Sequence, residues 1–134
     1  MGRQELTAIL LDTHAWAWSL TGDPRLSEGA TSAILEAGSV LVSPISFFEI
    51  GQKVRLGKWP QMAPHVDDLP ALLEEQGGRV ATLAPQICLQ GAVMPWDHRD
   101  PFDRLLAASA LHYSVPLVSA DEIFDTLPGL SRLW

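Results

Sequence analysis

The sequence predicts a single α/β domain over residues 1–134, a three-layer α/β/α sandwich around a mostly parallel sheet of roughly five strands. Short apolar runs with the composition of buried strands alternate with stretches of helical pattern, as in sheets covered by helices on both faces. A chain of 134 residues is large enough for one core and too small for two. Hydrophobic residues make up 47 % and charged residues 19 %, which is the balance of a globular protein.

The first half of the chain alternates strand and helix from its start. Residues 6–11 are continuously apolar and end at Asp12, as expected for a strand buried on both faces of a parallel sheet. The proline-rich residues 58–70 are expected to form a surface loop. Turn residues and terminal glycines then place helices at 13–20, 27–37 and 46–56 and a strand at 40–42.

The second half repeats the alternation. A helix at 66–76 is closed by two glycines, and two later helices carry proline in the first turn, where its missing N–H costs nothing. These later helices are expected at 85–93 and 101–113, with strands at 79–83, 116–119 and 130–134.

Composition limits the function classes. The apolar runs are far shorter than the roughly 20 residues that span a bilayer, and no secretory signal precedes them, so we expect a cytoplasmic protein without a membrane partner. Cys88 is the only cysteine, which excludes an internal disulfide, and its apolar neighbours predict a buried position. The net charge of −7 has the wrong sign for binding nucleic acid by phosphate contacts alone. Nucleic-acid chemistry would need a bound divalent metal or a local basic strip, and a basic partner protein would suit the remaining surface.

Four acids each lie just past a predicted strand or in the first turns of the next helix: Asp12, Glu49, Asp103 and Asp121. The carboxyl ends of parallel strands meet at one edge of a sheet, so the four are expected to share one crevice. Taken singly, each has a capping explanation, with Ser46 expected to cap the helix that carries Glu49 and Asp100 the helix that carries Asp103. Taken together, they would repel one another in a partly desolvated cleft, and a divalent cation removes that conflict.

Oxygen-only ligation favours a hard ion, Mg²⁺ or Mn²⁺, over Zn²⁺. The four histidines, His14, His65, His98 and His112, show no metal-ligand spacing and are expected to be structural or surface residues. His14 follows Asp12 closely enough to line the same cleft.

Four ordered segments resemble the motifs of PIN-domain ribonucleases, especially the VapC-type toxins of type II toxin–antitoxin systems. The four segments extend over nearly the whole chain. Each one alone is a weak signal, but all four in this order, in a chain of this length, make the resemblance specific. The segments are Leu10-Leu-Asp-Thr-His-Ala-Trp16, Ser43-Pro-Ile-Ser-Phe-Phe-Glu-Ile50, His98-Arg-Asp-Pro-Phe-Asp-Arg-Leu-Leu-Ala-Ala-Ser-Ala110 and Val118-Ser-Ala-Asp121.

The resemblance implies a five-stranded parallel sheet and an Mg²⁺- or Mn²⁺-dependent endoribonuclease that hydrolyses RNA phosphodiester bonds. Asp12 and Asp103 would be the central metal ligands, with Glu49 and Asp121 completing the site directly or through water, and Ser119 would hydrogen-bond within it. The resemblance also implies a homodimer and a small antitoxin whose extended C-terminal segment covers the active-site groove.

Basic residues near the motifs could hold the RNA backbone: Lys53, Arg55, Arg99 and Arg104. Lys53 and Arg55 could equally serve only to solubilise a helix end. Asp100 is explained by its capping role, and a supporting part in the site stays open. Trp16 and Trp18 are expected in the core or at a dimer interface, and Trp59 is expected to be exposed.

Three alternatives share parts of this pattern. An acid-cluster phosphatase or a phospho-receiver domain also places carboxylates and Mg²⁺ at a sheet edge. Such phosphatases use a second acid two residues after the first, where this chain has His14, and a receiver domain would need a lysine that is missing from residues 115–134. A PIN-like module without catalysis is the third alternative, and metal binding at the acids distinguishes an enzyme from it.

Overall fold

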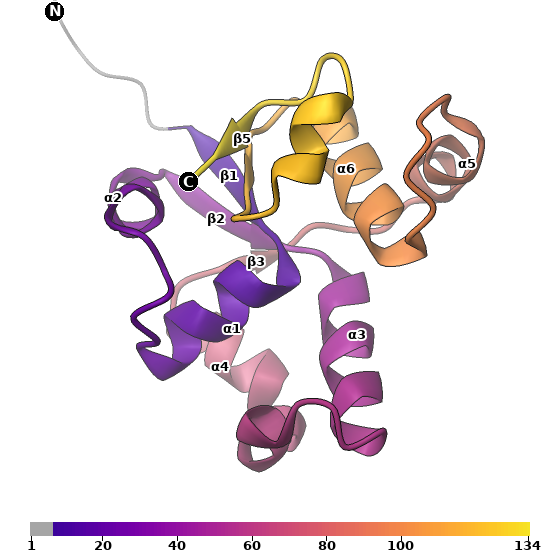
Figure 1. Ribbon diagram of the computed structural model, residues 1–134. Coiled ribbons are helices and arrows are strands. Elements are labelled where there is room, and N and C mark those ends of the chain that lie inside the picture. Colours follow the sequence, from indigo (N-terminus) through magenta and orange to yellow (C-terminus); the bar gives the residue numbers. More distant parts are fainter. Residues whose placement is uncertain (1–6) are drawn as a thin grey trace, which may run out of the picture.

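The computed structural model describes residues 7–134, and their five strands form one parallel sheet in the order β3-β2-β1-β4-β5 (Figure 1). Residue Leu6, the start of the expected first strand, lies outside the described residues. The predicted α/β class with a five-stranded sheet is confirmed. The strands are β1 (Ala8–Leu11), β2 (Ser39–Val42), β3 (Arg79–Val80), β4 (Leu117–Val118) and β5 (Arg132–Leu133).

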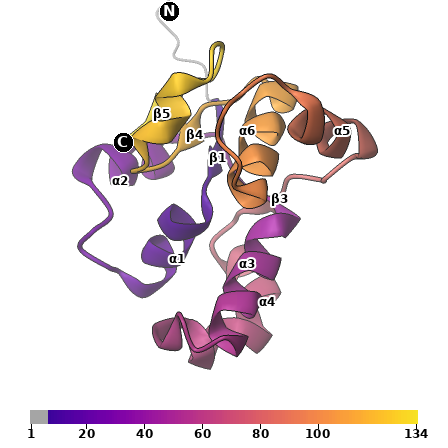
Figure 2. The same cartoon turned by 45° about the vertical axis from the view of Figure 1, so that its right-hand side comes forward.

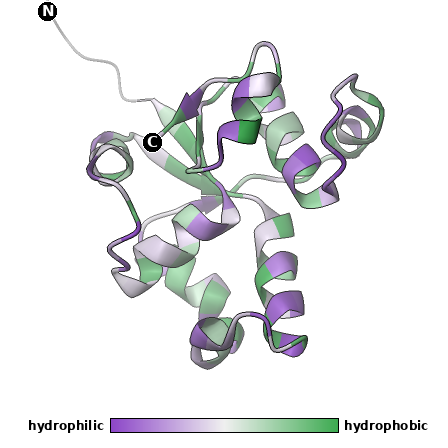
Figure 3. Cartoon of the chain, viewed as in Figure 1, coloured by the Kyte–Doolittle hydropathy of each residue, from purple (hydrophilic) through white to green (hydrophobic). Residues whose placement is uncertain are grey.

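Helices cover both faces of the sheet, as the side-chain alternation along β1 requires. Ile9 and Leu11 pack into a core with α1 (Thr13–Thr21), α2 (Glu28–Glu36), α3 (Pro44–Arg55) and α4 (Leu69–Glu75). Leu10 points to the opposite core, formed with α6 (Pro101–Tyr113) and the 3₁₀ helix η2 (Glu122–Thr126). Helix α5 (Pro85–Val93) packs on the outside of α6 (Figure 2). The central strands are mostly hydrophobic, as expected between two covering layers (Figure 3).

The strand register brings three loop starts together at one edge of the sheet. Leu11 at the end of β1 pairs with Val42 of β2 on one side and with Val118 of β4 on the other. The next residues along each chain segment are Asp12, Ser43 and Ser119, so they lie side by side where the strands end. This edge therefore holds the residues that the sequence singled out.

The expected N-cap of α3, Ser46, is wrong by three residues. The helix begins at Pro44 with Ser43 as its N-cap, and the Ser43 hydroxyl accepts a hydrogen bond from the Ile45 amide at 3.2 Å. Proline suits the first helical position, so the cap moves ahead of it. Ser46 is therefore inside the helix, and the capping box that would have explained Glu49 does not form.

The proline-rich segment is folded rather than a loose surface loop. It forms the 3₁₀ helix η1 (Pro60–Asp68), which runs directly into α4, so the expected helix at 66–76 is split. Trp59, expected to be exposed, is only 9 % exposed because η1 folds it back into the core beside Met62, which is 1 % exposed. The number of prolines predicted a loop without regular structure. The segment folds instead because the apolar side chains near the prolines pack into the core.

Cys88 was expected to be buried, and it is exposed. Helix α5 turns Ile87 and Gly91 toward α6, and a Cβ added at Gly91 would lie 3.3 Å from the Arg104 carbonyl oxygen. This close approach leaves Cys88 on the outer side, together with Leu89 and Val93, which are 66 % and 77 % exposed.

Candidate active site

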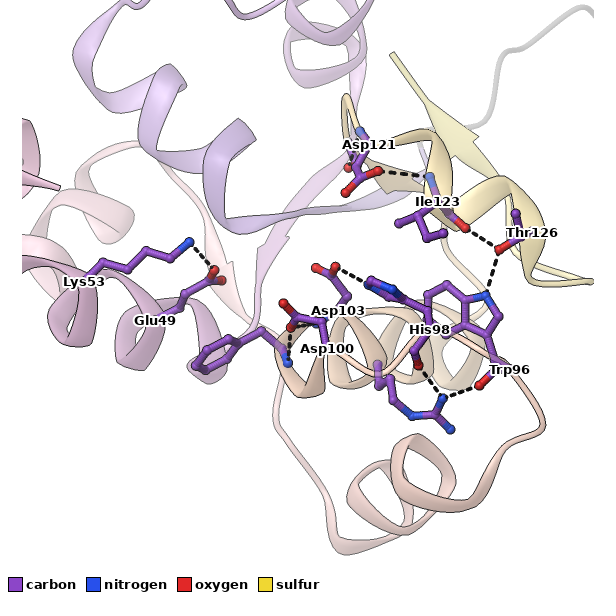
Figure 4. A network of polar contacts seen from close by, with 12 residues as sticks. Glu49, Lys53, Trp96, His98, Asp100, Asp103, Asp121, Ile123 and Thr126 are labelled. Atoms are coloured by element: carbon purple, nitrogen blue, oxygen red, sulfur yellow. Dashed lines mark hydrogen bonds and ion pairs between the residues drawn. The ribbon is translucent and has the colours of Figure 1, made fainter. Parts of the chain in front are cut away.

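The acids Asp12, Glu49, Asp103 and Asp121 line one cleft of about 210 Å³ at the carboxyl edge of the sheet. They come from four separate segments: the end of β1, the middle of α3, the first turn of α6 and the loop after β4. Figure 4 shows three of them, with Glu49 on one side and Asp103 and Asp121 on the other. Thr13, His14, Lys53 and Asp100 also line the cleft.

Asp12 is the N-cap of α1, and its Oδ1 accepts a hydrogen bond from the Ala15 amide at 2.8 Å. The pKa of Asp12 is raised to about 6, mainly by burial and to a smaller extent by the negative charges of Asp103 and Glu49. Hydrogen bonds from Ser119 and the Ala15 amide pull this pKa down without overcoming burial. The carboxylate of Asp12 is thus held in a position where an added positive charge would stabilise it.

Ser119 connects the first acid to the last. Its side chain is fully buried, and its hydroxyl oxygen accepts a hydrogen bond from the Asp121 amide at 3.0 Å. The same hydroxyl donates toward the Asp12 carboxylate. Ser119 therefore fixes the turn that carries Asp121 relative to the end of β1.

Glu49 lies in the second turn of α3 and is 8 % exposed. Ser46, one turn earlier, shares a buried hydrogen bond of 2.8 Å with the Thr13 hydroxyl, which ties the start of α3 to the start of α1. The Glu49 Oε2 atom forms an ion pair of 2.8 Å with the Lys53 ammonium one turn later (Figure 4). Lys53 is therefore a residue of the cleft rather than a solubilising group at the helix end.

His98 forms a contact that the sequence did not suggest. Its Nε2 atom lies 2.7 Å from Asp103 Oδ2 (Figure 4), and this hydrogen bond lowers the pKa of Asp103, which burial raises above its ordinary value. The charges of Asp100 and Asp121 raise it further. The five-residue separation of His98 and Asp103 spans the helix start, so no helical periodicity relates them.

Arg104 makes contacts within the protein that the sequence did not suggest. Its guanidinium donates to four main-chain carbonyl oxygens at 2.6 to 2.8 Å, which neutralises the end of α5 and holds the following loop. One of these oxygens belongs to His98, so the clamp also fixes the residue that contacts Asp103. The four acceptors are Gly91, Met94, Trp96 and His98.

Asp100 caps α6, with Oδ1 accepting hydrogen bonds from the Phe102 and Asp103 amides at 2.8 and 3.1 Å. This is the capping role that the sequence predicted. Asp100 also borders the cleft, where its charge acts on Asp103. Arg55 and Arg99 are both exposed.

The donor set fits a hard divalent cation. The cleft offers carboxylate oxygens, the ligands that Mg²⁺ and Mn²⁺ prefer, and burial disfavours the charge on two of them, Asp12 and Asp103. Among residues 7–134, no three acidic, histidine or cysteine side chains are gathered closely enough to hold an ion as they stand. Lys53 and His98 instead occupy oxygens of Glu49 and Asp103.

The chain is a parallel α/β sandwich with a carboxylate-lined cleft at the carboxyl edge of its sheet. Proteins of this α/β class bind their ligands at that edge. Within this class the chain belongs to the PIN domain family, whose model matches residues 9–130.

Named relatives agree with this family. The chain is 30 % identical over 117 residues to ribonuclease VapC22 of Mycobacterium tuberculosis, covering 87 % of this chain and 88 % of the relative. Its fold is similar to VapBC2 from Rickettsia felis, solved bound to a DNA fragment from its promoter, with a TM-score of 0.64 at 14 % identity over 94 % and 97 % of the two chains. It is also similar to a toxin–antitoxin complex from Klebsiella pneumoniae, with a TM-score of 0.59 at 13 % identity over 91 % and 94 %.

Proposed function

We propose that this chain is an Mg²⁺- or Mn²⁺-dependent endoribonuclease that acts as the toxin of a bacterial toxin–antitoxin pair and inhibits translation. The observation that carries the proposal is the cleft in which acids from four separate segments meet. The relative in Mycobacterium tuberculosis is named a ribonuclease, which supports the same chemistry here. A non-catalytic module would have no need to gather four acids in one cleft, two of them with raised pKa values.

In the proposed site, Asp12 and Asp103 hold the metal ion, and Glu49 and Asp121 complete its surroundings directly or through water. When bound, such an ion lowers the pKa of water and neutralises charge that develops on phosphate oxygens during hydrolysis. Ser119 keeps Asp12 and Asp121 in place. His98 orients the Asp103 carboxylate through its hydrogen bond.

The cations nearest the site hold the RNA backbone. Lys53 is 31 % exposed at its side chain and would exchange Glu49 for a phosphate oxygen once the ion takes up the glutamate charge. Arg99 and Arg55 are exposed and free to contact phosphates further along the strand. Arg104 is left out of this set because its donors are satisfied within the protein.

The proposed partners are a small antitoxin and a second copy of the chain, in the cytoplasm. Solved neighbours of this fold include toxin–antitoxin complexes, which supports the first. A chain with a net charge of −7 and an acidic cleft fits an antitoxin segment that carries arginine or lysine. In the part of the chain that the structure describes, no helix is long and apolar enough to cross a membrane.

The test is to purify the chain alone and incubate it with cellular RNA and Mn²⁺, then sequence the new RNA ends. We expect specific cleavage by the wild type and none by Asp12→Asn, whose circular dichroism spectrum should match the wild type because asparagine also caps α1. Equal cleavage by both proteins would remove Asp12 from the site. A wild type that cleaves no RNA with any divalent metal would contradict the proposal.

A further inference from the structure

A second hollow, of about 360 Å³, lies on the α1 and η1 side of the molecule, and the proposed chemistry does not use it. We call it the base pocket. Two indole rings and an arginine stand out among its walls, which include Trp18, Thr21, Arg25, Trp59, Gln61 and Met62. Trp18 is only partly buried, unlike Trp16 on the same helix, which is completely buried in the core.

His14 links this pocket to the acid cleft through its contact with Trp59. Its ring lines the acid cleft and at the same time stacks on Trp59, with ring centroids 4.7 Å apart. The centroid of Trp18 is 5.6 Å from the same ring. The stacked rings of His14, which lines the cleft, and Trp59, which lines the pocket, therefore lie between the two hollows. A strand whose phosphate lies in the acid cleft would bring the base of a neighbouring nucleotide to the pocket.

Two cations border the indole rings. The Lys53 ammonium lies 5.7 Å from the centroid of Trp59 while it pairs with Glu49 of the cleft. The Arg25 guanidinium lies 5.0 Å from the centroid of Trp18, paired with Asp23, and its side chain is 65 % exposed. Both cations are paired with carboxylates in the folded chain, so a phosphate backbone that passes here would compete with Asp23 and Glu49 for them.

The chemistry of the walls selects a flat ligand with polar edges. Unstacked bases of single-stranded RNA stack on tryptophan rings and on guanidinium planes, and side-chain amides read their edges. Gln61 at the wall offers both a donor and an acceptor, so it can distinguish one base edge from another. A duplex would not fit this description, because its bases remain stacked on one another.

We propose that the base pocket binds one nucleobase of single-stranded RNA, next to the phosphate that lies in the acid cleft, and so sets a base preference beside the cleavage position. This inference rests on the proposed ribonuclease function and goes further, because it assigns substrate recognition to Trp18 and Gln61, while the buried Trp59 supports the pocket wall.

The test pairs a change in the protein with a change in the RNA. The substrate is a single-stranded oligonucleotide of about ten residues around a mapped cleavage position, with an abasic residue introduced at each position in turn. The protein variants are Trp18→Leu, which keeps an apolar side chain but loses the flat ring, and Trp18→Phe, which keeps a ring. Phe48→Leu is the matched control, since Phe48 is 60 % exposed and lines neither hollow.

We expect one abasic position next to the cut to raise the KM of the wild type about tenfold to a hundredfold, with a much smaller change in kcat. Trp18→Leu should raise KM similarly with the intact RNA and lose its sensitivity to that abasic position. Trp18→Phe should recover most of the affinity, and Phe48→Leu should behave as the wild type. Affinity for Mn²⁺, measured by calorimetry, should be the same in all four proteins.

Two results would overturn the inference. If Trp18→Leu cleaves with wild-type KM, or keeps the full increase in KM at that abasic position, the pocket does not hold a base although the ribonuclease function stands. If Trp18→Leu loses Mn²⁺ affinity together with activity, the tryptophan supports the fold of the site and the pocket carries no recognition. A wild type without any RNA cleavage would remove the proposed function first, and the inference with it.

Discussion

Asp12 is both a helix cap and a half-buried acid with a raised pKa, and this raised pKa makes the stability of the metal-free protein depend on pH. Its pKa is about 6 in the folded chain against an ordinary 3.8, so between these values the folded chain holds more protons than the unfolded one. The free energy of unfolding should therefore fall as pH rises from about 4 to about 6 and level off above, by on the order of 1 to 3 kcal/mol. Asp103, whose pKa is also raised by burial, acts in the same direction.

The measurement is urea unfolding in the presence of a chelator, at several pH values, for the wild type and Asp12→Asn. His14 opposes the trend, because burial lowers its pKa and stability from this group rises with pH up to its ordinary 6.5. The difference between the two proteins removes the His14 contribution and isolates Asp12. A difference that does not change with pH would show that Asp12 titrates normally in the folded chain.

His98 should matter for metal binding although it is no expected ligand. It holds Asp103 Oδ2 at 2.7 Å, and partners that orient a ligand typically change metal affinity or activity by about tenfold to a hundredfold. We expect His98→Ala to weaken Mn²⁺ binding in calorimetry within this range. His98→Gln should restore part of the affinity, because its amide nitrogen can replace Nε2. Unchanged affinity in His98→Ala would mean that Asp103 needs no such support.

At the scale of residues, the sequence predicted that the four acids share one cleft, as they do, but not which side chains contact them. The acids follow predicted strands, and parallel strands end at one edge, so their convergence could be expected. The contacts of Lys53 and His98 depend on side-chain direction and on the path of a loop. The role of Arg104 was missed for the same reason, since the loop that it clamps has no regular structure.

The pair of α5 and α6 depends on Arg104, which replaces missing hydrogen bonds at the end of α5 and in the next loop. We expect Arg104→Lys to lower the free energy of unfolding by about 2 to 4 kcal/mol, because a lysine cannot reproduce the planar fork that serves four carbonyl oxygens. Urea unfolding measures this. Arg99→Lys is the matched control next to the same helix and should cost less than about 0.5 kcal/mol. Equal effects in both variants would contradict the clamp.

At the scale of elements, helices with proline in the first turn and regular apolar spacing were predicted correctly, whereas the proline-rich segment and the start of α3 were not. Helices α5 and α6 begin and end where proline at the first turn and apolar spacing placed them. The start of α3 was misplaced because two serines three residues apart are both good caps, and only the proline between them decides. Helix η1 was missed because prolines were given more weight than the apolar residues that they separate.

At the scale of the whole molecule, negative charges gathered in the cleft repel one another, and a bound cation would reduce this repulsion. The chain carries −7 overall, and its cleft gathers acids that lie on well-separated segments. In the described part of the chain, Lys53 forms an ion pair with Glu49 and His98 shares a hydrogen bond with Asp103, whereas Asp12 has no ion pair. The predicted five-stranded α/β fold was confirmed as a whole because alternating patterns and chain length constrain the topology strongly.

The most direct test of the account is the shift in melting temperature on adding Mn²⁺ to the wild type and to Asp12→Asn. An ion that binds only the folded chain stabilises it by roughly 2.7 kcal/mol at a hundred times its dissociation constant, or about 10 °C for a domain of this size. Without metal, Asp12→Asn should melt slightly higher than the wild type, because it relieves the repulsion and burial of charge at Asp12. With metal, its shift should be much smaller than that of the wild type. A shift of equal size in both proteins would place the ion elsewhere and contradict the account.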